Sequence, residues 1–159
     1  MEPTITSKEA FPIIGIELKT TTNGGRNYVE IPRFWEKILQ EGQIDNIPDR
    51  KFERILLGIC TDFESDGSFS YIIGAEVAST ENVPNDMISR TIPAATYAVF
   101  TVRGKMPASI QDTFKFIYQE WLPTSKYQRA ASAEFELYDE RFDDSENSEM
   151  DIFIPIVPV

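Results

Sequence analysis

The chain has 159 residues, 42% of them hydrophobic and 26% charged, which is typical of one compact domain spanning residues 1–159. The net charge of −11 argues against direct DNA binding and favours cationic ligands, although an acidic surface also serves solubility. The absence of histidine excludes Ser-His-Asp catalysis and histidine-containing metal sites. A single cysteine, an N-terminus unlike a signal peptide and no run of about 18 apolar residues predict a cytoplasmic protein without membrane spans.

The first half of the chain has the pattern of one strand, one helix and two more strands. The amphipathic helix has Pro32 in its first turn and Gly42 at its end, and Pro12 lies near the start of the first strand. Residues 20–30 are expected to form a flexible connection. We predict these elements at residues 9–20, 31–42, 54–63 and 69–77.

The second half has the same pattern. Its helix can be capped by Ser109 and ended by Pro123, and Pro93 lies near the start of its first strand. Residues 78–89 would link the two halves. We predict these elements at residues 90–104, 109–121, 134–142 and 150–157.

Pro12 and Pro93 lie 81 positions apart, and the same offset aligns the two helices and the later strands. The sequence therefore predicts an α+β fold built as a tandem pseudo-symmetric βαββ repeat, with halves at about residues 1–80 and 90–159. The two halves would share one antiparallel sheet, with both helices on one face. A ligand cleft would lie on the other face, between the halves.

Acidic and aromatic side chains alternate along the predicted strand that contains Phe135. Glu136, Tyr138 and Glu140 share one strand face, and we place Phe153 on the same face from the neighbouring strand. A carboxylate among aromatic rings suits a flat organic cation. An ordinary exposed sheet face is the alternative interpretation.

The chain also resembles, over essentially its whole length, the GyrI-like small-molecule-binding family, which includes effector-binding domains of multidrug-sensing and AraC-type bacterial activators. The specific motifs lie in the second half. The shared pattern is a helix ending in W-L-P-x-S-x-Y, then F-E-x-Y, then E-x-x-I-x-I-P. Here it consists of Trp121, Leu122, Pro123, Ser125, Tyr127, Phe135, Glu136, Tyr138, Glu149, Ile152, Ile154 and Pro155.

The resemblance implies a duplicated βαββ fold and a ligand cleft ringed by aromatic residues, with Glu136 facing the ligand. By analogy it adds Tyr71, Tyr97, Trp121 and Tyr127 to the ring-lining residues. Trp35, on a helical stripe, is expected in the core instead. Because the sequence has no helix-turn-helix pattern, we expect a stand-alone member of the family.

These residues and the resemblance suggest three functions. The first is binding or sequestering of small cationic or amphipathic aromatic molecules by Glu136. The second is hydrolysis of reactive cyclopropane-type natural products, with Glu136 as general base and Tyr97 or Tyr138 as proton donor. The third is binding of a protein partner, such as gyrase or a regulator, through the acidic run at residues 143–149. No motif indicates a cofactor or a metal, and the oligomeric state stays open.

Overall fold

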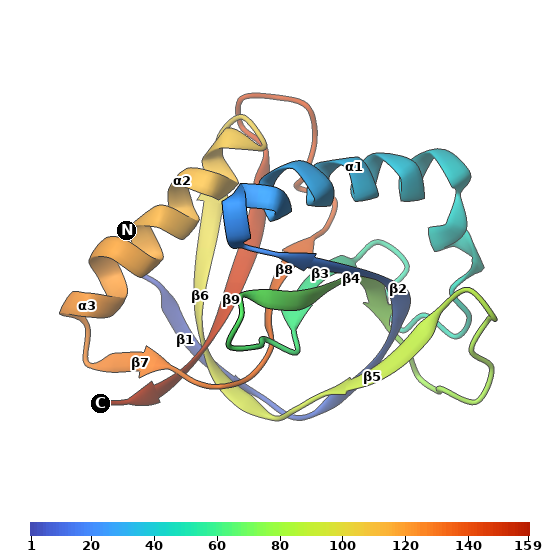
Figure 1. Ribbon diagram of the computed structural model, residues 1–159, viewed down its shortest axis with the longest axis horizontal. Helices are drawn as coiled ribbons and strands as arrows, with labels where there is room; N and C mark the ends of the chain where they lie inside the picture. The colour runs from blue at the N-terminus through green and yellow to red at the C-terminus, as the bar shows by residue number, and fades with distance from the viewer.

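The computed structural model describes residues 1–159 and contains one nine-stranded antiparallel sheet with two main helices (Figure 1). The strands are β1 (Thr4–Lys8), β2 (Phe11–Thr21), β3 (Leu56–Thr61), β4 (Ser68–Glu76), β5 (Ile88–Ile92), β6 (Ala95–Arg103), β7 (Tyr127–Arg129), β8 (Glu134–Tyr138) and β9 (Glu149–Pro158). The helical segments are η1 (Asn23–Gly25), α1 (Arg26–Glu41), η2 (Gln43–Asn46), α2 (Ala108–Phe116), the π-helical turn η3 (Ile117–Trp121) and α3 (Leu122–Thr124). These elements confirm the predicted α+β class.

The strands follow the order β1-β6-β9-β8-β3-β4-β2-β5 across the sheet, and β7 pairs with β9. Strands β3 and β8, which come from different halves of the chain, are hydrogen-bonded neighbours in the middle of this order. Along the chain, α1 lies between β2 and β3, and the second helical segment lies between β6 and β7. The first and second halves of the chain therefore meet at the centre of the sheet, where β3 pairs with β8, and β1 also pairs with β6 at one edge.

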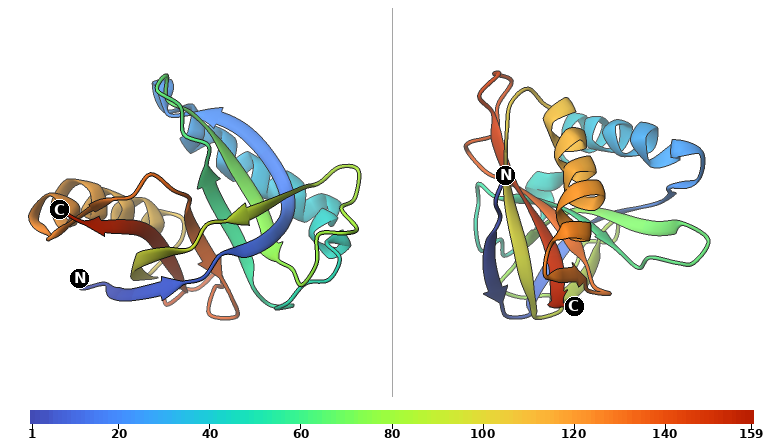
Figure 2. Two further views of the ribbon diagram at one scale, coloured as in Figure 1. Left: turned by 90° about the horizontal axis from the view of Figure 1, so that it is seen from below. Right: turned by 90° about the vertical axis from the view of Figure 1, so that its left-hand side faces the viewer.

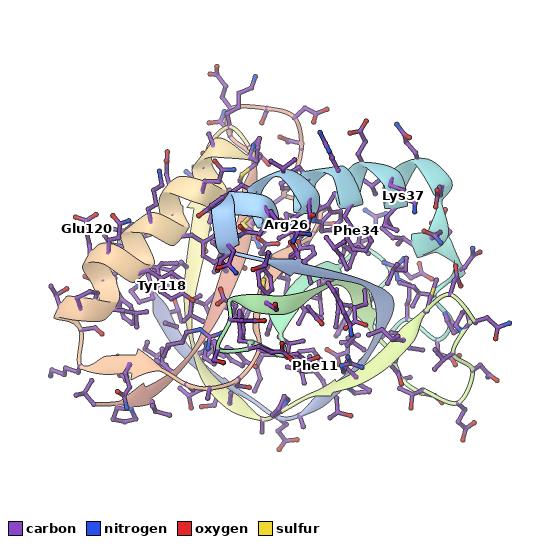
Figure 3. The ribbon with its side chains drawn as sticks, viewed as in Figure 1. Phe11, Arg26, Phe34, Lys37, Tyr118 and Glu120 are labelled. Carbon is purple, nitrogen blue, oxygen red and sulfur yellow. The ribbon has the colours of Figure 1, made fainter.

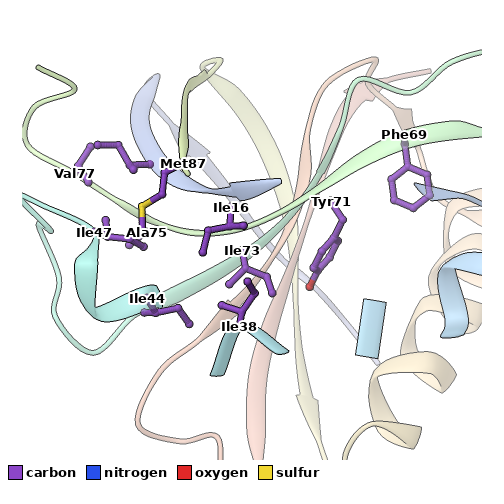
Figure 4. Close-up of a cluster of buried hydrophobic side chains, with 11 residues drawn as sticks. Ile16, Ile38, Ile44, Ile47, Phe69, Tyr71, Ile73, Ala75, Val77 and Met87 are labelled. Atoms are coloured by element: carbon purple, nitrogen blue, oxygen red, sulfur yellow. The ribbon is translucent and has the colours of Figure 1, made fainter. Parts of the chain in front are cut away.

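Both helices cover the same face of the strongly curved sheet (Figures 1 and 2). Helix α1 packs on β2 and β4 through the buried Ile38, and Figure 4 shows Tyr71 between Ile73 and Phe69 in this cluster. The second helical segment packs on β6 and β9 through Ile117. The central strands β3 and β8 lie between these two contact regions, because α1 contacts β2 and α2 contacts β6.

The opposite face of the sheet is closed by a third apolar cluster. Its buried members are Phe11, Ile13, Leu57, Ile59, Ile72, Ile92, Tyr97, Ala133, Phe135 and Phe153. Aromatic rings make many of its contacts, including the stack of Phe135 on Phe153 with centroids 4.5 Å apart. This face is therefore filled by the protein's own side chains.

Helix α1 begins earlier than its apolar periodicity predicts. The residues at its start are polar or exposed, with Tyr28 62% and Val29 51% exposed, so they add nothing to an apolar stripe. Gly24 and Gly25 adopt positive φ angles and turn the chain into the helix. Pro32 consequently lies inside α1, whereas the predicted helix end at Gly42 is confirmed.

The predicted strand at 90–104 is two strands, β5 and β6, which are separated at Pro93 and pair with β2 and β9 respectively. The predicted strand at 134–142 ends at Tyr138, because the Asp139 carboxylate accepts the backbone N–H of Arg141 in a turn. Strands β1 and β7 are short and largely exposed, and the sequence pattern did not indicate them.

The second helical segment also differs from its prediction. Ser109 does not cap it, since its hydroxyl donates to the Lys105 carbonyl. The α-helical geometry ends at Phe116, and residues 117–121 form the π-helical turn η3 before the chain continues into α3. Of the helices described, none is long and apolar enough to cross a membrane.

Candidate functional site

The register of the central strands decides where Glu136 points. Glu136 lies directly opposite Gly58 on β3 and Ile152 on β9. Ile152 packs with the helical segment at Ile117, so Glu136 also projects from the helix-covered face. This corrects the prediction that Glu136 would face away from the helices.

The carboxylate of Glu136 is held by two phenols. Tyr71 donates its hydroxyl to Oε1 of Glu136 at 2.7 Å, and Tyr138 donates to the same oxygen at 3.1 Å. The indole Nε1 of Trp35 in turn donates to the Tyr71 hydroxyl at 2.7 Å. The second oxygen, Oε2, has no hydrogen-bond partner in the protein and is not among the fully buried polar atoms. One oxygen of Glu136 is therefore fixed by the protein and the other is not.

Aromatic rings from three parts of the chain surround this carboxylate. Trp35 on α1 meets the Tyr138 ring edge-on, with centroids 5.2 Å apart. Phe142, which follows β8, makes a similar contact with Tyr138 at 4.9 Å and is 38% exposed. Tyr71 adds a fully buried ring from β4. The predicted combination of a carboxylate and aromatic rings thus occurs around Glu136, Tyr71 and Tyr138.

Gly58 makes room for the bond between Tyr71 and Glu136. A Cβ atom at this position would overlap the Tyr71 hydroxyl and lie 2.5 Å from Oε1 of Glu136. Any larger residue on β3 would therefore displace one of the two partners. The absence of a side chain at position 58 is a condition for this hydrogen bond.

Burial dominates the electrostatics of the site. Desolvation raises the pKa of Glu136 to about 7, although the hydrogen bonds from Tyr71 and Tyr138 lower it. Burial and the neighbouring Glu136 charge raise the pKa values of both tyrosines well above the usual range, so both stay protonated as donors. Near neutral pH, Glu136 is thus balanced between its charged and neutral forms.

A second acidic residue, Glu134, lies on the same face of β8 but has its own partners. Tyr118 donates its hydroxyl to Oε1 of Glu134 at 2.7 Å, and Arg129 forms an ion pair with the same oxygen at 3.1 Å. Tyr118 reaches this position from η3, and Figure 3 shows it on the sheet side of the helix, whereas Glu120 lies on the outer side.

The structure places Phe153 and Tyr97 on the opposite face from Glu136, and the prediction for Phe153 was wrong. Phe153 pairs with Phe135, one residue out of phase with Glu136. A shift of one residue in register moves a side chain to the other face, and the sequence does not fix the register between strands. The Tyr97 ring packs edge-on against both phenylalanines, and its hydroxyl is buried without a partner.

Trp121 and Tyr127 are not brought to Glu136 either. Their rings stack on each other with centroids 6.1 Å apart, and Trp121 contacts Phe100 edge-on at 5.1 Å. Glu140 lies beyond the end of β8, is exposed and pairs with Arg54. These residues belong to the packing of the second half and to the surface.

Trp35 and Gly58 are the site residues that the sequence pattern did not reveal. The apolar stripe of the helix correctly places Trp35 against the sheet. An indole N–H in such a position needs a hydrogen-bond acceptor, and this requirement was the signal that could have identified Trp35 as a site residue. Gly58 carried no comparable signal, since its role depends on contacts from β4 and β8.

Neither of two surface pockets, one beside Leu39 and Asp45 and the other beside Glu17 and Arg90, is lined by Glu136.

Comparison with known sequences gives a match along nearly the whole chain. The model of a family described as "Cass2: Integron-associated effector binding protein" matches residues 4–156. The transcriptional regulator BrlR of Pseudomonas aeruginosa is 32% identical over 158 residues, which is 98% of this chain and 56% of BrlR. The putative transcriptional regulator protein YobU of Bacillus subtilis is 21% identical over 79% of both chains. The chain thus spans about half the length of BrlR.

Solved structures share the fold. The structure of SAV2435 bound to tetraphenylphosphonium superposes with a TM-score of 0.86 at 23% identity, covering 99% of this chain and 94% of that one. The integron cassette protein VCH_CASS2 of Vibrio cholerae gives a TM-score of 0.73 at 21% identity, covering 98% and 96%. Because the family match extends over almost every element described above, the chain belongs to the integron-associated effector binding protein (Cass2) family.

Proposed function

We propose that this protein binds small organic cations or amphipathic aromatic cations on the helix-covered face, above β3 and β8, with Glu136 as the charge partner. The observation that carries the proposal is the state of the Glu136 carboxylate. One oxygen is fixed by Tyr71 and Tyr138, and the other has no partner in the protein.

A cationic ligand would relieve the energetic cost of this arrangement. A desolvated carboxylate without a cation is unfavourable, and an organic cation beside it would restore favourable electrostatics. The rings of Trp35, Tyr71 and Tyr138 would add cation–π attraction and apolar contact. Recognition by rings and one charge, rather than by many directional bonds, suits ligands of varied shape.

The comparisons support the same ligand class. Tetraphenylphosphonium, bound in the SAV2435 structure, is a large aromatic monocation, and this chain shares nearly the whole of that fold. The matching family is described as effector binding, and BrlR is named a transcriptional regulator. We therefore propose that ligand binding in this chain serves an effector-binding or sequestering role.

The position of the site supports the proposal of a tandem repeat with halves at about 1–80 and 90–159. Strands β3 and β8 pair at the middle of the strand order, one from each half, and Glu136 projects from this junction. Since Trp35 and Phe142 both pack against Tyr138, which donates to Glu136, we propose that a cleft opens when the partly exposed Phe142 or the Trp35 ring moves aside.

Titration with tetraphenylphosphonium tests the proposal directly. We expect calorimetry at pH 8 to show binding by the unmodified protein, and Glu136→Gln to weaken it about tenfold or more, because a charge partner at this range is worth over 1 kcal/mol. Glu140→Gln is the matched control, since this exposed carboxylate lies outside the site. Equal affinity in the protein and in Glu136→Gln would refute the role of Glu136.

The pKa of Glu136 gives a second candidate function, hydrolysis of an electrophilic natural product with Glu136 as general base. A carboxylate with a pKa of about 7 and a free oxygen can accept a proton from water. Tyr138, which donates to the other oxygen of Glu136, would be the proton donor to the leaving group. Incubation with a cyclopropane-containing electrophile, followed by mass spectrometry, tests this function. Turnover that disappears in Glu136→Gln would support it, and recovery of unchanged compound would exclude it for that substrate.

A further inference from the structure

The face that carries Glu136 also carries a carboxylate whose cation is supplied by the chain itself. Glu134 and Glu136 alternate along β8, so both point toward the helices from positions about 7 Å apart along the strand. Glu134 is 7% exposed and forms the ion pair with Arg129. Glu136 has no ion pair and accepts hydrogen bonds only from phenols.

The surroundings of Arg129 resemble those that an organic cation would find beside Glu136. Its guanidinium carbon lies 4.8 Å from the centroid of the Phe63 ring, and its Nε donates to Tyr118 Oη at 3.2 Å. A ring, a phenol and a carboxylate thus surround the planar guanidinium of Arg129. Rings, phenols and a carboxylate also occur together at Glu136, where the chain supplies no cation.

Arg129 is fixed in this position by its remaining donors. Nη1 donates to the Ala130 carbonyl at 2.7 Å, and Nη2 donates to the Ser132 carbonyl at 3.0 Å. The guanidinium therefore ties the chain between β7 and β8 to Glu134, and a ligand would have to break several bonds to displace it.

We propose that Arg129 sets the charge of the ligand: by neutralising Glu134 it leaves one unpaired carboxylate on this face, so the site selects organic monocations over dications. This inference rests on the proposed function of Glu136. Two carboxylates and one guanidinium leave a single negative charge for the ligand to balance. The second charge of a dication would be desolvated without a partner and would be repelled by Arg129.

Two ligands of matched shape test this inference. The cation 1-methyl-4-phenylpyridinium has two rings and one charge, whereas methyl viologen has two rings and two charges about 7 Å apart, the spacing of alternate residues on a strand. Dissociation constants for both would be measured by calorimetry at pH 8. We expect the unmodified protein to prefer the monocation about tenfold or more, in line with Coulomb repulsion at this distance.

Variants at the ion pair separate charge from structure. Arg129→Gln should shift the affinity ratio about tenfold toward methyl viologen, because Glu134 becomes an unpaired carboxylate. Arg129→Lys, which keeps the charge, and the double variant Arg129→Gln/Glu134→Gln, which removes both charges, should each retain the preference of the unmodified protein. If Arg129→Gln does not fold, Glu134→Gln replaces it, and its unpaired Arg129 should weaken binding of the monocation about tenfold.

The outcomes distinguish this inference from the function on which it rests. If tetraphenylphosphonium does not bind the unmodified protein, the proposed function fails and the charge selection fails with it. If tetraphenylphosphonium binds but the unmodified protein shows no preference for the monocation, or Arg129→Gln leaves the ratio unchanged, only the role of Arg129 is refuted. A ratio in the double variant equal to that of Arg129→Gln would assign the shift to altered packing and would also overturn the proposal.

Discussion

At the scale of single residues, the binding role proposed for Glu136 comes with a cost to stability. Its pKa of about 7 results from desolvation that two phenol hydrogen bonds only partly offset. The protein has no histidine, so few other groups titrate near neutral pH. Both the binding and the stability of the protein should therefore report the titration of this one side chain.

Binding of a permanently charged ligand should depend on pH through Glu136. Tetraphenylphosphonium keeps its charge at all pH values, whereas the charged fraction of Glu136 falls as the pH drops below its pKa. We expect the affinity at pH 6 to be about tenfold weaker than at pH 8. Calorimetric titrations at both pH values measure this difference. The Glu136→Gln variant should show no such dependence, and an equal affinity of the unmodified protein at both values would contradict the prediction.

The unliganded protein should become more stable when Glu136 is replaced by Gln, and only at high pH. Below the ordinary pKa of 4.5 the carboxyl is neutral in both the folded and unfolded states. As the pH rises from 4.5 to about 7, the carboxyl ionises in the unfolded state but stays protonated in the folded state, so the folded state loses stability over this range. We expect Glu136→Gln to raise the free energy of unfolding by about 1–3 kcal/mol at pH 8 and by little at pH 5.

Urea denaturation at the two pH values measures that effect. Glu140→Gln serves again as the control, because its carboxylate is exposed and should change stability by less than about 0.5 kcal/mol at either pH. A Glu136→Gln variant less stable than the unmodified protein at pH 8 would show that the carboxylate stabilises the fold.

At the scale of elements, the site requires three strands and one helix to converge. Strand β4 supplies Tyr71, β8 supplies Glu136, and α1 supplies Trp35. Strand β3 lies between β4 and β8 and has no side chain at Gly58. The hydrogen bond from Tyr71 to Glu136 thus crosses over β3. The geometry of β3 is therefore as important to the site as the donors and acceptors.

Gly58→Ala should disturb the site through this crossing. The new Cβ would overlap the Tyr71 hydroxyl, so we expect a loss of about 1–3 kcal/mol in the free energy of unfolding. We also expect tetraphenylphosphonium binding to weaken. The double variant Gly58→Ala/Tyr71→Phe removes the overlapping oxygen and should recover part of the stability relative to the sum of the single variants. Additive losses in urea denaturation would contradict this steric explanation.

At the scale of the whole molecule, one continuous sheet joins the two halves. Strand β3 pairs with β8 at the centre, and β1 and β5 each pair with a strand of the other half, β6 and β2 respectively. The protein should therefore unfold as one cooperative unit. Single-tryptophan variants test this expectation, because Trp35 lies in the first half and Trp121 in the second.

Trp121→Phe leaves Trp35 as the only tryptophan, and Trp35→Phe leaves Trp121. In each variant we expect the urea transition followed by tryptophan fluorescence to coincide with that followed by far-ultraviolet circular dichroism. Different urea midpoints for Trp35 and Trp121 fluorescence, together with two steps in the circular dichroism curve, would show that the halves unfold independently.

The sequence by itself determined the α+β class, the end of α1 at Gly42 and the presence of a carboxylate among aromatic residues around Glu136 and Tyr138. Local periodicity and turn residues carry this information, since they depend on neighbours along the chain. Only the tertiary structure decided that Glu136 points toward the helices, that Phe153 points away from it, and that Trp35 and Gly58 take part in the site. These features depend on the register between β3, β8 and β9, where a shift of one residue exchanges the two faces of a strand.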